Sequence, residues 1–163
     1  MLLSMQTDYA IRVLLDIGSN WLGQGVITRT LAERLHVPRV FLTKIVAQLA
    51  AYGFLRTQRG KGGGIALSRS PAQINLLEVI EVFEGRIRST ACTSSEDFCC
   101  LIKGCAIRGL WTGAEDNLRN YLAGYTLADL VEAASRLGAS DTPDVSDLAG
   151  ANHLAQAVPV PHG

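Results

Sequence analysis

The fold is decided by residues 28–53, which read TRTLAERLHVPRVFLTKIVAQLAAYG. Residues 28–35 have their apolar side chains on one face and predict a short helix. Pro38 suits the first position of a second helix, since its missing N–H costs nothing there, and this helix should run to about Ala51. Gly53 follows in the position that glycine usually takes after a helix. A short helix, a tight turn and a longer helix together predict a helix-turn-helix.

The outward face of the second helix carries cations and polar groups in its N-terminal half. Such side chains suit a helix that enters the major groove of DNA, where they can reach the base edges. The apolar side chains of the same helix, such as Leu42, Ile45 and Leu49, are expected to face inward. The residues of this region predicted to contact DNA are Thr28, Arg39, Val40, Thr43, Lys44 and Gln48.

A β-hairpin is predicted directly after the helix-turn-helix. Residues 54–59 alternate as a strand does, residues 60–64 form a glycine-rich turn, and residues 65–68 form the return strand. A hairpin in this place is a wing, and its glycines let the backbone approach a phosphate chain or a minor groove closely. A nucleotide-phosphate loop is the rival interpretation, but the stretch lacks a Gly-Lys-Ser/Thr ending and opens no helix. The predicted DNA contacts of the wing are Arg59, Lys61 and Gly62.

The charge distribution agrees with a polyanionic partner. The formal net charge of the chain is zero, but residues 29–69 carry eight Lys and Arg residues against one acidic residue, Glu33. A local positive excess of this kind suits nucleic acid, although a solvated basic face would show the same count. The helix-turn-helix and the hairpin therefore decide between the two interpretations.

Four further helices and one polar loop are predicted in the rest of the chain. The helix after the loop has a wide apolar face, which suits packing against a second copy better than burial within a monomer. The loop is expected over Arg86 to Gly104. The four helices outside the helix-turn-helix are expected over about Thr7 to Ile17, Asn75 to Gly85, Ala106 to Gly124 and from Thr126 onward.

These elements predict a mainly α-helical chain with one small hairpin and a long C-terminal dimerisation helix. The expected division is a winged helix-turn-helix domain at 1–85, a cysteine-rich loop at 86–105, dimerisation helices at 106–137 and a disordered tail at 138–163. The N-terminus lacks a basic start with a long apolar centre, and no apolar stretch approaches the ~20 residues of a membrane helix. We therefore expect a cytoplasmic protein with no membrane partner.

All the cysteines of the chain lie within residues 92–105, at Cys92, Cys99, Cys100 and Cys105. This window is polar, whereas buried free cysteines are normally scattered through apolar stretches. In a reducing compartment, clustered cysteines indicate metal or redox chemistry. The adjacent pair seldom ligates one ion together, so three ligands with one spare is the more natural count. The spacing favours an iron–sulfur cluster and redox-active thiols about equally, with zinc behind them.

Taken together, these stretches resemble the family of dimeric winged-helix iron–sulfur transcriptional regulators that includes IscR, NsrR and RirA. The resemblance runs over residues 1–137 and is strongest to the NsrR branch. It is carried by Thr7–Arg12, the wing at 59–64, the cysteine loop with its Cys99-x5-Cys105 gap, and Tyr125–Val131.

The resemblance implies a ligand set for a cluster. Cys92, Cys99 and Cys105 match the cysteine ligands of the family, and Cys100 is a bystander or, less favoured, a substitute for Cys99. Arg108 stands where the IscR branch has a histidine, so the resemblance favours a 4Fe–4S cluster over a 2Fe–2S cluster.

Asp8 matches an aspartate that, in the NsrR branch, reaches the cluster of the other subunit. The resemblance therefore implies Asp8 of the partner subunit as a possible fourth ligand. Without such a role, Asp8 still suits the positive end of its helix.

The expected function is a homodimeric repressor that binds a double-stranded operator under the control of an iron–sulfur cluster, with nitric oxide as the favoured signal. An iron-responsive regulator like RirA, or a cluster-status regulator like IscR, is the alternative within the same class. A thiol-based redox protein is more distant, because no histidine lies near the loop to serve as a base. We therefore expect no enzymatic activity.

Overall fold

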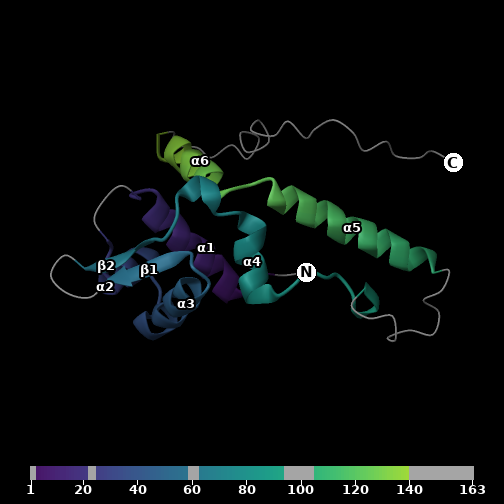
Figure 1. The fold of residues 1–163 in the computed structure, drawn as a ribbon, viewed down its shortest axis with the longest axis horizontal. Coiled ribbons are helices and arrows are strands. Elements are labelled where there is room, and N and C mark those ends of the chain that lie inside the picture. Colours follow the sequence, from purple (N-terminus) through teal and green to yellow (C-terminus); the bar gives the residue numbers. More distant parts are fainter. Residues whose placement is uncertain (1–2, 22–24, 59–62, 94–104, 140–163) are drawn as a thin grey trace.

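The computed structural model describes residues 3–21, 25–58, 63–93 and 105–139. In these ranges the chain is mainly helical, with one two-stranded antiparallel sheet (Figure 1). The elements are α1 (Met5–Gly18), α2 (Thr28–Leu35), α3 (Arg39–Ala51), β1 (Leu55–Gln58), β2 (Gly64–Leu67), the 3₁₀ turn η1 (Pro71–Gln73), α4 (Leu76–Glu84), the 3₁₀ turn η2 (Ala91–Thr93), α5 (Ala106–Ala123) and α6 (Leu127–Ala139).

The helix-turn-helix is present as expected. Its turn places His36 in the left-handed region, at φ 52°, and Pro38 is the residue just before α3 instead of its first residue. Gly53, at φ 76°, ends α3 as predicted. The inner faces of α2 and α3 pack on α1 in one core, whose fully buried members include Leu14, Leu31, Leu42, Leu49 and Phe54.

The hairpin continues directly from the helix-turn-helix. Leu55 pairs with Leu67, and Gln58 pairs with Gly64, so each strand lies within one residue of its predicted bounds. The backbone of Val26, before α2, exchanges two hydrogen bonds of 2.8 Å with Ile65 of β2. A Cβ at Gly64 would lie 2.6 Å from the carbonyl carbon of Gly25, so only glycine fits this close approach. The wing is thereby joined to the segment that leads into α2.

The helix ends differ from the predicted ones by one or two residues. α1 begins at Met5, because the Ser4 hydroxyl accepts a hydrogen bond from the N–H of Thr7. α4 is capped by the Asn75 side chain, as predicted. α6 continues to Ala139, into what was expected to be the tail. The remainder of that tail lies outside the described residues.

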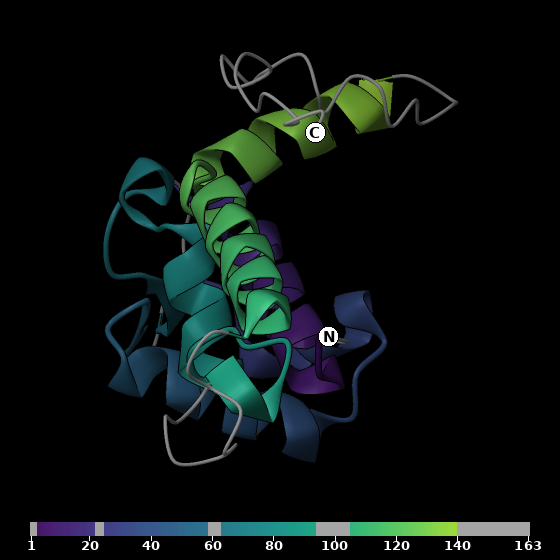
Figure 2. The same cartoon turned by 90° about the vertical axis from the view of Figure 1, so that its right-hand side faces the viewer.

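α5 runs out past α4, away from the hairpin end of the molecule (Figure 1). Figure 2 shows α5 alongside α4, with α6 crossing at its C-terminal end. Among the residues of α5, Glu115 alone is buried, while the apolar side chains form an exposed stripe. The large members of this stripe are Ile107, Leu110, Trp111, Leu118 and Tyr121. None of the described helices has both the length and the apolar character that crossing a bilayer requires.

Candidate functional site

The surface that the sequence predicts to contact DNA is the outward side of α3. Arg39, Val40, Thr43 and Lys44 are all exposed there, with Val40 at 74%. Thr43 Oγ1 donates a hydrogen bond of 2.8 Å to the backbone oxygen of Arg39, which holds this hydroxyl against the helix. The opposite side of α3 is buried in the core, so the helix presents these four side chains on a rigid support.

Gln48 lies on the same helix but has a different environment. Its side chain is half-buried, and its Nε2 donates a hydrogen bond of 3.2 Å to the backbone oxygen of Val82 on α4. This contact ties the recognition helix to α4. Sequence periodicity placed Gln48 on the outer face but could not show that α4 covers that part of it.

The start of α2 and the base of the wing line one shallow groove. Thr28 from α2 faces Thr57 and Gln58 from β1 and Gly63 to Ile65 from the return strand across it. Ile27, the residue before α2, gives this helix no side-chain cap, so the first N–H groups of α2 are available to an anionic ligand. Thr57 and Gln58 line this candidate groove although the sequence pattern did not single them out, because alternation marks a strand but not the element that lies beside it. Arg59, Lys61 and Gly62 lie outside the described residues.

Two of the candidate cysteine ligands lie within the described residues. Cys92 lies in η2, and Cys105 is the residue just before α5; both are free and half-buried. The Cys92 Sγ lies 3.0 Å from Thr90 Oγ1. Cys99 and Cys100, between them in the chain, lie outside the described residues.

Glu115 of α5 anchors the segment that carries Cys92. Its Oε1 accepts hydrogen bonds from the backbone N–H of Ser89 at 2.5 Å, from the Ser89 hydroxyl at 2.7 Å and from the Thr93 hydroxyl at 2.7 Å. Burial alone would raise the pKa of Glu115, but these hydrogen bonds outweigh burial and lower it. No local sequence signal marks Glu115, because its partners lie more than twenty residues earlier in the chain.

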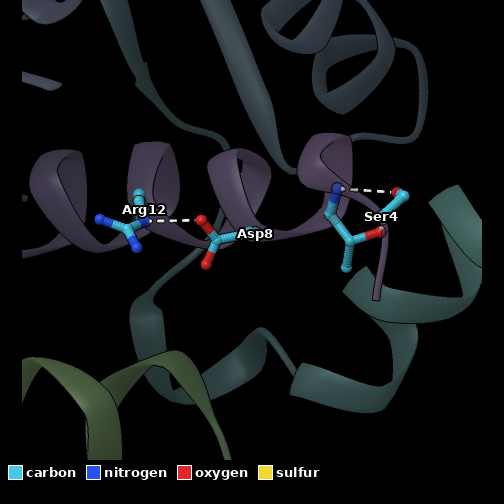
Figure 3. A network of polar contacts seen from close by, with 4 residues as sticks. Ser4, Asp8 and Arg12 are labelled. Carbon is cyan, nitrogen blue, oxygen red and sulfur yellow. Dashed lines mark hydrogen bonds and ion pairs between the residues drawn. The ribbon is translucent and has the colours of Figure 1, made fainter. Parts of the chain in front are cut away.

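Asp8 lies on the exposed side of α1, where its Oδ2 accepts a hydrogen bond of 2.8 Å from Arg12 Nε (Figure 3). Glu84, at the end of α4, holds the first turn of α1 in place. Glu84 Oε1 accepts from the Ser4 N–H at 2.8 Å and from the Thr7 hydroxyl. Hydrogen bonds from Thr7 and Ser4 lower the pKa of Glu84. Asp8 therefore stands on a helix end that α4 holds in place.

Comparison with known proteins identifies the family. The model of the family Rrf2, described as an iron-dependent transcriptional regulator, matches residues 3–133. The chain belongs to the Rrf2 family. It is 33% identical over 135 residues to the transcriptional regulator NsrR of Bacillus subtilis, a match that covers 81% of this chain and 91% of that protein. Rrf2 proteins such as this relative are DNA-binding transcriptional regulators and not enzymes.

Solved Rrf2 structures share the fold. CymR, the global cysteine regulator of B. subtilis, superposes with a TM-score of 0.68 at 25% identity, covering 81% of this chain and 97% of that one. IscR of T. potens superposes with a TM-score of 0.67 at 22% identity, covering 82% and 88%. These neighbours confirm the winged-helix fold predicted from the sequence.

The described thiols of this Rrf2 chain suit an iron–sulfur cluster in their chemistry. Thiolates are soft ligands that iron–sulfur clusters require, and Cys92 and Cys105 stand at the two ends of one loop. Within the described residues, no three His, Cys, Asp or Glu side chains gather as a metal site. The third ligand expected from the sequence, Cys99, falls in the part of the loop outside those residues.

Proposed function

We propose that this Rrf2 regulator is a homodimeric repressor whose operator binding is controlled by a 4Fe–4S cluster, with nitric oxide as the signal. The proposed ligands are Cys92, Cys99 and Cys105, with Asp8 of the partner subunit in the fourth position. The observation that carries the proposal is the place of the thiols. Cys92 comes after the proposed DNA-binding part of the chain, and Cys105 is the residue just before α5, so a change in the loop acts on both parts.

The division of labour along the chain follows from this arrangement. We propose that residues 1–85 bind DNA, residues 86–105 hold the cluster and residues 106–137 make the dimer. The exposed apolar stripe of α5 supports the dimer, because a monomer would leave Ile107 and Leu110 63% and 67% exposed to water. Two recognition helices related by a two-fold axis read half-sites about 34–36 Å apart, so the relative position of the subunits determines affinity.

On the DNA, the side chains of α3 and of the wing have separate tasks. We propose that Arg39 and Lys44, both exposed on α3, read bases in the major groove, and that the exposed Val40 makes an apolar contact of the kind that recognises a thymine methyl group. Thr28 at the start of α2 and Lys61 in the wing contact phosphates, which position the protein but carry no sequence information.

The path from the loop to α3 runs through α4. When bound, the cluster would present one iron that lacks a cysteine thiolate ligand, and nitric oxide would attack that iron. Arg119 of α5 pairs with Glu81 of α4, and the next residue of α4, Val82, accepts the hydrogen bond from Gln48 of α3. A shift of α5 is therefore transmitted to the helix that reads DNA, and this is the physical basis of the proposed control.

The test is spectroscopy of the anaerobically purified protein, titrated with nitric oxide while operator binding is followed in parallel. We expect broad visible absorbance that nitric oxide removes, with loss of operator binding over the same titration. Cys99→Ala should abolish the absorbance, and the adjacent Cys100→Ala should retain it, which makes the neighbouring thiol a matched control. A colourless, iron-free wild-type protein that binds its operator with full, salt-sensitive affinity would contradict the proposal.

An iron-responsive regulator is the second candidate, because the description of the matched family names iron dependence. A parallel titration with an iron chelator, again following operator binding, separates the two functions. If an iron chelator releases the operator at concentrations where nitric oxide leaves it bound, iron supply is the signal.

A further inference from the structure

Glu115 is a buried carboxylate whose partners are all neutral donors. Its side chain lies on the inner face of α5, and the residue is 9% exposed. The next residue on that face, Arg119, pairs with Glu81 and not with Glu115. A buried carboxylate is costly unless hydrogen bonds replace its water, and here those bonds come from Ser89 and Thr93.

The donors lie on both sides of Cys92. Ser89, two residues before the short turn η2, supplies its N–H and its hydroxyl, and Thr93, the last residue of η2, supplies its hydroxyl. The turn has further ties: Arg88 Nη1 donates to the Thr93 oxygen at 2.6 Å, Thr93 Oγ1 also lies 2.8 Å from the Thr90 oxygen, and Thr90 Oγ1 lies 3.0 Å from Cys92 Sγ. The backbone at Cys92 is therefore held on α5 through residues three before it and one after it.

We propose that Glu115 is a positioning residue that holds Cys92 in place for cluster ligation and joins the cysteine loop to α5. The assignment rests on the proposed function, because it presumes a cluster on the loop. Glu115 touches Ser89 and Thr93 and not the thiol, so it acts through them. A loop ordered in advance loses less conformational entropy when its thiol binds, and outer residues that orient a ligand typically change metal affinity roughly 10- to 100-fold.

The same contacts give the loop a reciprocal hold on α5. When the Cys92 segment moves away, Glu115 loses the donors that replace its water, so the carboxylate has to be solvated instead. The inner face of α5 at Glu115 then no longer has the segment packed on it. Docking of the loop on Glu115 and binding of the cluster are thereby coupled. Such coupling is reciprocal in free energy, so an interaction that stabilises the docked loop also stabilises the bound cluster.

The test measures how fast the loaded protein loses its absorbance to an iron chelator under anaerobic conditions. Glu115→Ala should lose the cluster roughly 10- to 100-fold faster than wild type. Glu115→Gln should fall between the two, because the amide oxygen still accepts from Ser89 and Thr93. Asp116→Ala, at the exposed acidic neighbour on the same helix, should match wild type.

A second readout uses the cluster-free protein. Glu115→Ala should speed hydrogen exchange at the Ser89 N–H and alkylation of Cys92, while Asp116→Ala changes neither. If Glu115→Ala does not fold, Thr93→Val decides, because it removes one donor and leaves α5 intact; cluster loss several-fold faster is expected, and loss at the wild-type rate overturns the assignment.

The outcomes separate the two proposals. A wild-type protein that holds no cluster overturns the proposed function and this assignment with it. A wild-type protein that holds the cluster, with Glu115→Ala losing it at the wild-type rate, overturns the role of Glu115 alone.

Discussion

Gln48 Nε2 on the recognition helix donates a hydrogen bond to the backbone oxygen of Val82 on α4, across 3.2 Å. The residue before Val82, Glu81, pairs with Arg119 of α5, and Glu84 at the end of α4 accepts from Ser4 and Thr7 of the α1 terminus. One nine-residue helix therefore contacts the DNA-reading helix, the long exposed helix and the helix that carries Asp8.

Gln48→Ala removes the tie between α3 and α4. We expect the free energy of unfolding to fall by about 1 kcal/mol, because the Val82 oxygen loses a half-buried hydrogen bond. Urea denaturation of the cluster-free protein measures the change. Gln58→Ala, at an exposed glutamine of β1, is the control and should stay within about 0.5 kcal/mol of wild type. A Gln48→Ala protein as stable as wild type would show that the contact contributes nothing.

Arg39→Ala and Lys44→Ala should relax sequence specificity. Each is expected to cost about 1–3 kcal/mol on the operator and little on random DNA, since base contacts exist only on the correct sequence. Lys61→Ala should weaken binding to both DNAs and reduce the salt slope by about 1. Titrations on operator and scrambled duplexes at several salt concentrations make the distinction. Equal losses on both DNAs for all three variants would contradict this division between helix and wing.

Leu110→Glu places a charge in the middle of the apolar stripe of α5. We expect dimer dissociation to become roughly 30-fold easier or more, equivalent to a loss of about 2 kcal/mol, because a buried carboxylate there has no partner. Analytical ultracentrifugation over a range of concentrations measures it. Asp116→Lys, on the polar side of the same helix, should leave the association unchanged. If Leu110→Glu remains as dimeric as wild type, the stripe is not the subunit contact.

Asp8→Ala tests the proposed fourth ligand separately from its local ion pair. Asp8 and Arg12 are both more than half exposed, so breaking their pair should change stability by about 0.5 kcal/mol or less. Arg12→Gln breaks the same pair but keeps the carboxylate. We expect the visible spectrum of the loaded protein to change in Asp8→Ala and to stay unchanged in Arg12→Gln. Identical spectra for both variants and wild type would remove Asp8 from the ligand set.

Acid should destabilise the fold partly through Glu84. Its folded pKa lies below the ordinary value, so Glu84 contributes stability above the unfolded pKa of about 4.3, and this contribution is lost as the pH falls through the folded pKa. Glu84→Gln should therefore flatten the pH dependence of the urea midpoint below about pH 5. Glu132→Gln, at an exposed carboxylate of α6, is the control and should keep the wild-type slope. An unchanged slope in Glu84→Gln would contradict the prediction.

Local patterns were sufficient for the elements of this protein. The apolar spacing of Leu42, Ile45 and Leu49 marked the buried side of α3, and the alternation around the glycine-rich turn marked the hairpin to within one residue. Only some of the residues that cap the helices were predicted from the sequence. Asn75 caps α4 as expected, whereas Ser4 caps α1 and extends it beyond the apolar pattern. These features depend on neighbours three or four residues apart, which periodicity reports directly.

The positions of Glu115 and Gln48 were not predictable in this way. Glu115 lies 26 residues after Ser89, and Gln48 lies 34 residues before Val82, so no local pattern connects either pair. Both side chains are polar; Gln48 was expected on the DNA-facing side of its helix, and no expectation for Glu115 came from the sequence. Each became half-buried or buried only because another element packs over it.

By itself, the sequence determined the winged helix-turn-helix, the basic surface on one part of the chain and the family to which it belongs. Those properties follow from backbone preferences, apolar periodicity and residue types that act within a few positions. Only the tertiary structure decided that α4 joins the recognition helix to α5, and that a carboxylate of α5 holds the segment of Cys92. Such contacts depend on how helices pack, and packing is set by the whole core, in which distant side chains compete for the same space.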